Sequence, residues 1–244
     1  LHTNFKLSAS GEYLALVQPD GTTIACAFAP AFPPQVSDVS YGFSMSSSNV
    51  ILVCSNAPCA AFVPRNNALG VTWTSNAPVS ETGWLHGQGG VGFERGSGYQ
   101  TLFGIDVGAP MYASNATCYL RIPFVLEAAT QFSAFTVRMM YDDGFVAYVN
   151  GRRLADANAP ATLAYNSRAT TIHADSAAVL FEEFPALQPL TLDGGTNILA
   201  VHGLNQMPTS SDFLIVPELI GSIGGEIDTN TAVYFPRPTP GAPN

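Results

Sequence analysis

Two adjacent carboxylates, Asp142 and Asp143, are the residues of this sequence with the most evident chemistry, and Gly144 follows them directly. They end the apolar run 135–141, whose β-branched and aromatic residues are typical of a strand. Two ionised carboxylates at one turn repel each other, and a hard cation with oxygen ligands relieves that repulsion. The pair therefore predicts a metal site with calcium as the ion, and calcium with open positions can also bind sugar hydroxyls. The alternative is a turn in which one Asp accepts main-chain N–H groups.

A second polar cluster lies where two predicted strands meet a loop, at His202, Asn205 and 210–212. His202, Asn205 and Asp212 are predicted here as ligand-binding residues. The alternative is a loop whose polar groups satisfy one another.

Aromatic residues are candidates for stacking on sugar rings, because an amphipathic ring has an apolar face and a polar edge. The candidates are Trp73, Trp84, Tyr99 and Tyr112, of which Trp84 and Tyr99 are predicted to bind ligand. Burial in the core is the alternative for each of them.

A hydrolase that acts on polysaccharide needs two carboxylates about 5–10 Å apart across a cleft. Asp142 or Asp143 could act with Glu94, Glu183 or Asp212, but their spacing selects no pair. The sequence contains no phosphate-binding loop that ends in lysine, no nucleophile-elbow serine and no paired-histidine zinc helix. The glycines at 87, 89 and 92 have the spacing of a dinucleotide-binding loop, but no helix can begin after them, so they are interpreted as loop glycines.

Cys54 and Cys59 enclose the turn-forming segment Ser-Asn-Ala-Pro, and a small disulfide loop is predicted there. A metal-binding pair and free thiols are the alternatives. A bridge between Cys26 and Cys118 is a further alternative.

The composition excludes several classes of partner. Nine basic and eighteen acidic residues give a net charge of −9, and Lys6 is the single lysine. A basic patch for nucleic acid or for an anionic membrane is therefore not expected. No apolar run is long enough to span a bilayer. Scarce lysine and polar loops favour an extracellular, secreted location, and the polar residues after Leu1 indicate a mature fragment.

Helical periodicity is nearly absent, and short β-branched and aromatic runs alternate with Gly, Pro, Asn and Asp. This pattern predicts an all-β, antiparallel sandwich. The expected strands are 12–17, 22–28, 50–53, 117–126, 135–141, 145–149, 152–155, 198–204 and 213–219. Turns at 142–144 and 150–151 are expected to join the three strands around them into one antiparallel sheet.

Residues 68–222 resemble a galactose-binding-like jelly roll of the kind found in secreted bacterial, planctomycete-type proteins and beside glycoside hydrolases. The resemblance rests on Trp84, Gly87, Gly90–Gly92, Tyr119, Phe124, Tyr141–Phe145, Tyr148–Gly151, Asn197, Ala200–His202 and Ser210–Asp212. The Asp-Asp-Gly turn is also similar to that of the sugar-binding jelly rolls of yeast adhesins. That likeness implies that Asp142 and Asp143 are calcium ligands.

The two ends of the chain resemble part of a bacterial lamin-tail domain, through Asn4–Leu7, Gly11–Leu16, Asp38–Gly42 and Tyr234–Asn244. The expected organisation is a partial lamin-tail-like segment at 1–45, a connecting segment at 46–67, the jelly roll at 68–222, and a returning strand with a proline-rich tail at 223–244. The jelly roll then interrupts a small immunoglobulin-like element. The segments before Gly42 and after Val233 are therefore predicted to lie side by side.

These features together predict a non-catalytic extracellular carbohydrate-binding or adhesion module that depends on calcium. Its expected partners are a polysaccharide or cell-surface glycan and the other domains of a larger parent chain. A structural spacer domain of a surface protein, filament or multidomain enzyme is the alternative, and a polysaccharide hydrolase is the second alternative.

Overall fold

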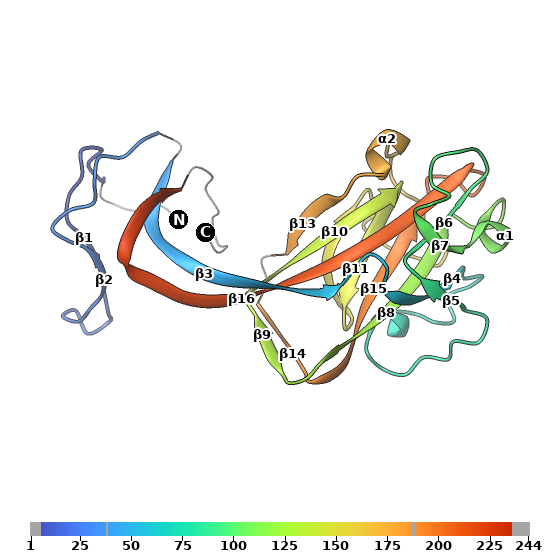
Figure 1. Ribbon diagram of the computed structural model, residues 1–244, viewed down its shortest axis with the longest axis horizontal. Helices are drawn as coiled ribbons and strands as arrows, with labels where there is room; N and C mark the ends of the chain where they lie inside the picture. Colours follow the sequence, from blue (N-terminus) through green and yellow to red (C-terminus); the bar gives the residue numbers. More distant parts are fainter. Residues whose placement is uncertain (1–5, 38, 187–188, 236–244) are drawn as a thin grey trace. The chain divides into compact units, whose positions relative to one another are not determined.

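A computed structural model describes residues 6–37, 39–186 and 189–235 of the chain (Figure 1). It divides the chain into two units, a smaller one from both chain ends (1–46 and 225–244) and a larger one from 47–224. No helix among the described residues is long and apolar enough to cross a membrane.

Two six-stranded sheets pack into the sandwich that the sequence predicts. The first sheet has the order β13 (Glu182–Ala186), β10 (Ala134–Asp142), β16 (Asp212–Phe235), β6 (Gly90–Glu94) and β7 (Phe103–Asp106), and β3 (Ser40–Val53) also pairs with β16. The second sheet has the order β12 (Arg152–Ala157), β11 (Gly144–Val149), β15 (Gly195–Leu204), β8 (Thr117–Leu126), β4 (Pro58–Phe62) and β5 (Leu85–Gln88). Along these two strand orders the neighbours are antiparallel, apart from the parallel pair β6 and β7.

The remaining elements of the larger unit are short. They are the antiparallel pair β9 (Thr130–Phe132) and β14 (Leu190–Leu192), the 3-10 turn η1 (Thr72–Thr74), and the single helical turns α1 (Gly108–Met111) and α2 (Asp175–Ala178).

Alternating burial builds the core between the two sheets. On β10 the side chains of Phe135, Val137 and Met139 are fully buried in it, while Leu120 and Ile122 of β8 enter from the opposite sheet. Successive side chains of a strand point to opposite faces, so every second residue reaches the core. The intervening residues of β8 and β15 form a separate cluster on the outer face of the second sheet.

The structure corrects the predicted arrangement around Asp142. The hairpin of β11 and β12 is present, and its turn residues Asn150 and Gly151 both have positive φ, as a tight hairpin turn requires. However, β10 and β11 do not pair, because β10 lies in the first sheet and β11 in the second. Asp142 and Asp143, which are joined by a cis peptide bond, lie at the crossing from one sheet to the other. The turn at 142–144 is therefore a corner of the sandwich.

The segment 46–67, which the sequence predicts as a connection before the jelly roll, also forms part of the sandwich. It contains strand β4, which belongs to the second sheet.

The sequence predicts loop glycines at 87 and 92, but Gly87 lies in strand β5 and Gly92 in strand β6. A Cβ atom at Gly92 would lie 2.4 Å from the Phe213 carbonyl oxygen, so close backbone packing in the strand requires glycine there.

The smaller unit joins the two chain ends. It contains the predicted hairpin, β1 (Leu14–Val17) and β2 (Ile24–Phe28). Within it the rings of Tyr41 and Tyr234 lie 5.0 Å apart, and the Tyr234 hydroxyl donates a hydrogen bond to the Pro34 carbonyl. The predicted proximity of the segments before Gly42 and after Val233 is confirmed, whereas the lamin-tail resemblance itself stays a prediction. The tail from 236 lies outside the described residues.

Candidate functional site

Asp143 is a buried carboxylate that holds two loops together. Its Oδ1 accepts a hydrogen bond from the main-chain N–H of His173 at 2.8 Å, and its Oδ2 accepts one from Gln206 N–H at 2.9 Å. The alternative reading of the sequence, a turn in which an Asp accepts main-chain N–H groups, therefore describes this residue. Its predicted role as a metal ligand stays a prediction.

Asp142 is different, because one of its buried oxygens makes no hydrogen bond of normal geometry with a described residue. The residue is only 3% exposed, and Oδ2 is buried without a hydrogen-bond partner among the residues that the structure describes. Burial raises the pKa of this carboxyl group to about 9, and the charges of Asp143 and Asp212 add to the shift. The Tyr99 hydroxyl lies close enough to Asp142 to lower the pKa of that carboxyl group as a donor, but it makes no hydrogen bond of normal geometry with a described residue. Burial together with the charge of Asp142 raises the pKa of Tyr99. A buried, unsatisfied carboxylate is costly and needs an explanation.

Two further carboxylates surround the unpartnered one. Asp142, Asp175 and Asp212 each offer an oxygen, and these oxygens all lie within 4.8 Å of one another. They line a cavity of about 260 Å³ that has no Lys or Arg among its lining residues. Burial raises the pKa of Asp212, and the charges of Asp175 and Glu94 act in the same direction. This cavity is called the acidic corner below.

The fold brings the three groups together from distant parts of the chain. Asp142 is the last residue of β10 and pairs with Leu214 of β16. Asp212 is the first residue of β16, so it lies at the same end of these two neighbouring strands. Asp175 begins α2, which lies at the end of β10 (Figure 1). The hydroxyls of Ser210 and Ser211 donate to Asp212 at 3.1 and 3.4 Å.

His173 attaches the α2 loop to the corner. Its ring stacks on Tyr141 with centroids 4.1 Å apart, Nδ1 lies 2.8 Å from the Tyr141 carbonyl oxygen, and Nε2 lies 2.9 Å from Oε1 of Glu182. No local pattern in the sequence links His173 or Asp175 to position 142, so neither residue could be assigned to this site from the sequence.

The predicted ligand-binding residues do not form one site. Asp212 lines the acidic corner. Asn205 does not line it, but its side-chain amide donates a hydrogen bond to the main-chain carbonyl of Asp212 at 2.6 Å. His202 lies in a separate aromatic cavity on the outer face of the second sheet. Trp84 stacks on Phe62 and is 7% exposed, and Tyr99 is 1% exposed. Both residues are buried, as in the alternative of core burial, and their predicted stacking on a sugar ring stays a prediction.

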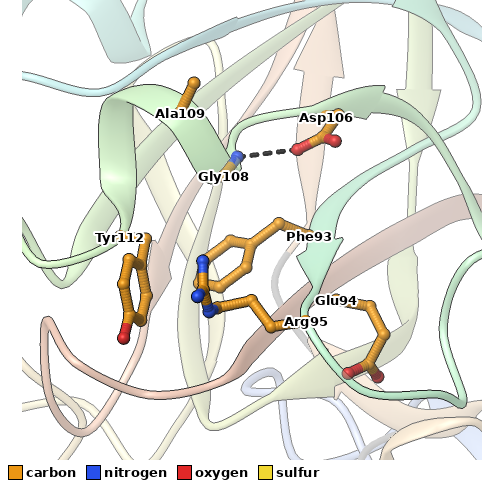
Figure 2. Close-up of a pocket in the computed structure, with 7 residues that line it drawn as sticks. All are labelled: Phe93, Glu94, Arg95, Asp106, Gly108, Ala109 and Tyr112. Atoms are coloured by element: carbon orange, nitrogen blue, oxygen red, sulfur yellow. Dashed lines mark hydrogen bonds between the residues drawn. The ribbon is translucent and has the colours of Figure 1, made fainter.

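The other carboxylates considered for hydrolysis, Glu94 and Glu183, do not line the acidic corner. Glu183 lies 3.5 Å from Nε of Arg138 in an ion pair. Glu94 lines a polar cavity of about 350 Å³, shown in Figure 2. In this cavity the guanidinium group of Arg95 lies 4.0 Å from the centre of the Tyr112 ring and covers one of its faces.

The predicted disulfide between Cys54 and Cys59 is absent, and the four cysteines, which all lie among the described residues, are free. Cys54 is exposed, and its thiol donates to the side-chain oxygen of Asn56 at 3.0 Å. Cys59 is buried, because its side chain points from β4 toward the core. Its thiol lies 3.4 Å from the Gly89 carbonyl oxygen. The two side chains thus belong to different environments, one in solvent and one in the core.

No family model matches the chain, and no curated protein matches it either. Among solved structures it is similar to a β-glucuronidase of an uncultured Clostridium species, with 9% identity and a TM-score of 0.38 over 79% of this chain and 30% of that one. A Ruminococcus gnavus β-glucuronidase has 11% identity and a TM-score of 0.33 over 79% and 29%. The chain thus spans less than a third of these enzymes, and a similarity this loose does not extend their activity to it.

Proposed function

We propose that this chain is a non-catalytic, extracellular carbohydrate-binding module that binds glycan through a calcium ion at the acidic corner. The observation that carries the proposal is the buried Oδ2 of Asp142, which makes no hydrogen bond of normal geometry with any described residue, while Asp142 lines a cavity together with two more carboxylates. Asp142, Asp175 and Asp212 are the proposed ligands. Asp143 holds the two loops that carry the other groups.

The chemistry of the donor set favours a hard cation. Carboxylate oxygens are the ligands that calcium and magnesium prefer, and softer metals prefer imidazole or thiolate. The three carboxylates repel one another when all are ionised, and no Lys or Arg lines the cavity to offset that charge. A proton on Asp142 relieves the repulsion below about pH 9, and a bound cation would take its place. Calcium suits the corner better than magnesium, because it accepts irregular geometry and about six to eight oxygens.

Sugar hydroxyls suit the positions that the protein leaves open. Three carboxylates do not complete the coordination of calcium, and the cavity of about 260 Å³ beside them has room for additional oxygen ligands. Vicinal hydroxyls of a glycan can fill two such positions. Binding by a single site of this kind is weak, and repeated modules in a parent chain would increase it by avidity.

The same geometry disfavours a hydrolase. Glycosidase carboxylates stand about 5–10 Å apart, with the scissile bond between them. Here the three oxygens lie within 4.8 Å of one another, and Asp142 is almost completely buried. This spacing suits one ion better than a sugar ring and a water molecule.

Calorimetric titration of calcium chloride into the chelator-treated chain tests the metal site. We expect one site, and we expect Asp175→Asn to weaken binding strongly, because it removes an anionic ligand that is exposed and not needed for the core. Asp193→Asn, which changes an exposed carboxylate elsewhere, is the matched control. Below its pKa of about 9 Asp142 holds a proton, so calcium binding near pH 7 should release about one proton. Absence of calcium binding would reject the site.

Pull-down on insoluble polysaccharides and a glycan array, each with calcium and with EDTA, test the carbohydrate role. Retention in calcium that EDTA and Asp175→Asn both abolish is the expected result. Calcium binding without retention on any glycan would favour the structural spacer function instead.

A further inference from the structure

A second cavity, of about 200 Å³, lies on the outer face of the second sheet and is separate from the acidic corner. Its floor comes from neighbouring strands, where Tyr119 of β8 stands directly opposite His202 of β15. Trp73 of η1 stacks on Tyr119 with ring centroids 4.0 Å apart, and Tyr148 and Tyr165 complete the aromatic lining. It is called the aromatic cavity below.

Hydrogen bonding defines the tautomer of His202. The Thr117 hydroxyl donates its single hydrogen to the Ser167 carbonyl at 2.9 Å, so its oxygen can only accept from His202 Nε2, which lies 3.1 Å away. Nε2 therefore carries the ring hydrogen. Burial lowers the pKa of His202 to about 3, which keeps the ring neutral. Nδ1 is then an acceptor with a free lone pair, and it makes no hydrogen bond to any residue within the described ranges.

The lining restricts the charge of a ligand. No Asp, Glu, Lys or Arg lines the aromatic cavity, and its imidazole is neutral. A carboxylate, phosphate or ammonium group would lose its hydration there without gaining an opposite charge. Only an uncharged ligand suits these walls.

The walls also restrict size and chemistry. The volume is below the roughly 300–1,000 Å³ of pockets for drug-sized ligands, so it suits a single ring. The lining combines the apolar side chains of Leu163 and Val71 with polar groups from Asn67, Thr74 and His202. A ring that has an apolar face and several hydroxyl groups matches this mixture.

We propose that the aromatic cavity is a second binding site, which takes one neutral monosaccharide unit and accepts a hydrogen bond from its hydroxyl group at His202 Nδ1. The site needs no cation and so does not depend on the acidic corner. The walls are fixed before binding, because the buried Arg121 guanidinium donates to the Trp73 and Ser75 carbonyls and holds the η1 segment. If both sites act, one module contacts a glycan chain at two places.

The test is NMR titration of the full chain with a panel of neutral methyl glycosides, in EDTA. The chain has two tryptophans, so Trp84→Phe leaves Trp73 as the only indole reporter. We expect at least one glycoside to shift the Trp73 and His202 side-chain signals at millimolar concentrations. His202→Gln keeps an N–H donor for Thr117 but removes the Nδ1 acceptor, and it should weaken binding by about fivefold or more.

Ala164→Phe is the second variant, because it fills the rim of the cavity without changing the pair formed by His202 and Thr117. It should abolish binding, whereas Asp175→Asn should leave binding at the aromatic cavity unchanged. The proposal is overturned if no glycoside of the panel shifts these signals, if both cavity variants bind as well as the parent chain, or if nitrogen spectra show the hydrogen of His202 on Nδ1. Loss of calcium binding at the acidic corner leaves this test unaffected, so the two proposals fail separately.

Discussion

Replacing Asp142 by Asn tests the acidic corner at its most deeply buried carboxyl group, because burial disfavours the ionised form of that group. The folded state raises the pKa of Asp142 from 3.8 to about 9, so without a cation the folded chain holds a proton that the unfolded chain has lost. Between these two pKa values the folded state binds one proton more than the unfolded state. The free energy of unfolding therefore decreases as pH rises through this range.

The size of the effect follows from the linkage. One proton corresponds to a loss of about 1.4 kcal/mol for each pH unit, or at most about 4 kcal/mol from about pH 5 to about pH 8. Asp142→Asn preserves the shape of the side chain and has no proton to lose. We expect this variant to lack that slope and to be more stable than the parent chain at alkaline pH in EDTA. With calcium the parent chain should regain stability at high pH, since the cation takes the place of the proton, and the variant should not.

Urea unfolding followed by tryptophan fluorescence at several pH values measures this difference. Both tryptophans, at 73 and 84, lie in the larger unit, so the signal reports on the unit that contains the site. Asp193→Asn is the control for the removal of one negative charge from an exposed position. If Asp142→Asn and the parent chain have the same pH dependence in EDTA, the burial argument is refuted.

Three further predictions test the surrounding structure. Asp143→Ala leaves two main-chain N–H groups without an acceptor and should cost about 2–5 kcal/mol of unfolding free energy, measured by urea unfolding; a loss below about 1 kcal/mol would contradict its role in holding the loops. Arg121→Met removes the buried donor to the η1 segment, and limited proteolysis should then cut this segment faster than in the parent chain; an unchanged cleavage rate would argue against that anchoring. A thiol reagent should modify Cys54 but not Cys59 in the native chain, because Cys59 is buried and burial raises its pKa to about 11. After unfolding the reagent should modify all four thiols, and thiols that stay unreactive in denaturant would indicate disulfides.

Features that depend on local sequence were predicted correctly. The alternation on β10 and β8 indicates strands with one buried face, and the Asn150-Gly151 turn indicates a hairpin. The Asp-Asp-Gly segment marks a place where the chain changes direction. Short glycine-rich strands such as β5 and β6 escaped prediction, because their glycines reflect close backbone packing that only the neighbouring strand reveals.

Composition and periodicity alone determined the all-β class, the hairpins and the presence of two carboxylates at a turn, because side-chain alternation and turn conformation depend on neighbours along the chain. Only the tertiary structure decided that β10 and β11 belong to different sheets, that Asp175 joins Asp142 and Asp212, and that His202 lies in another cavity. Strand order and burial arise from contacts between residues far apart in sequence. The unpartnered oxygen of Asp142 is likewise a property of what surrounds it in space.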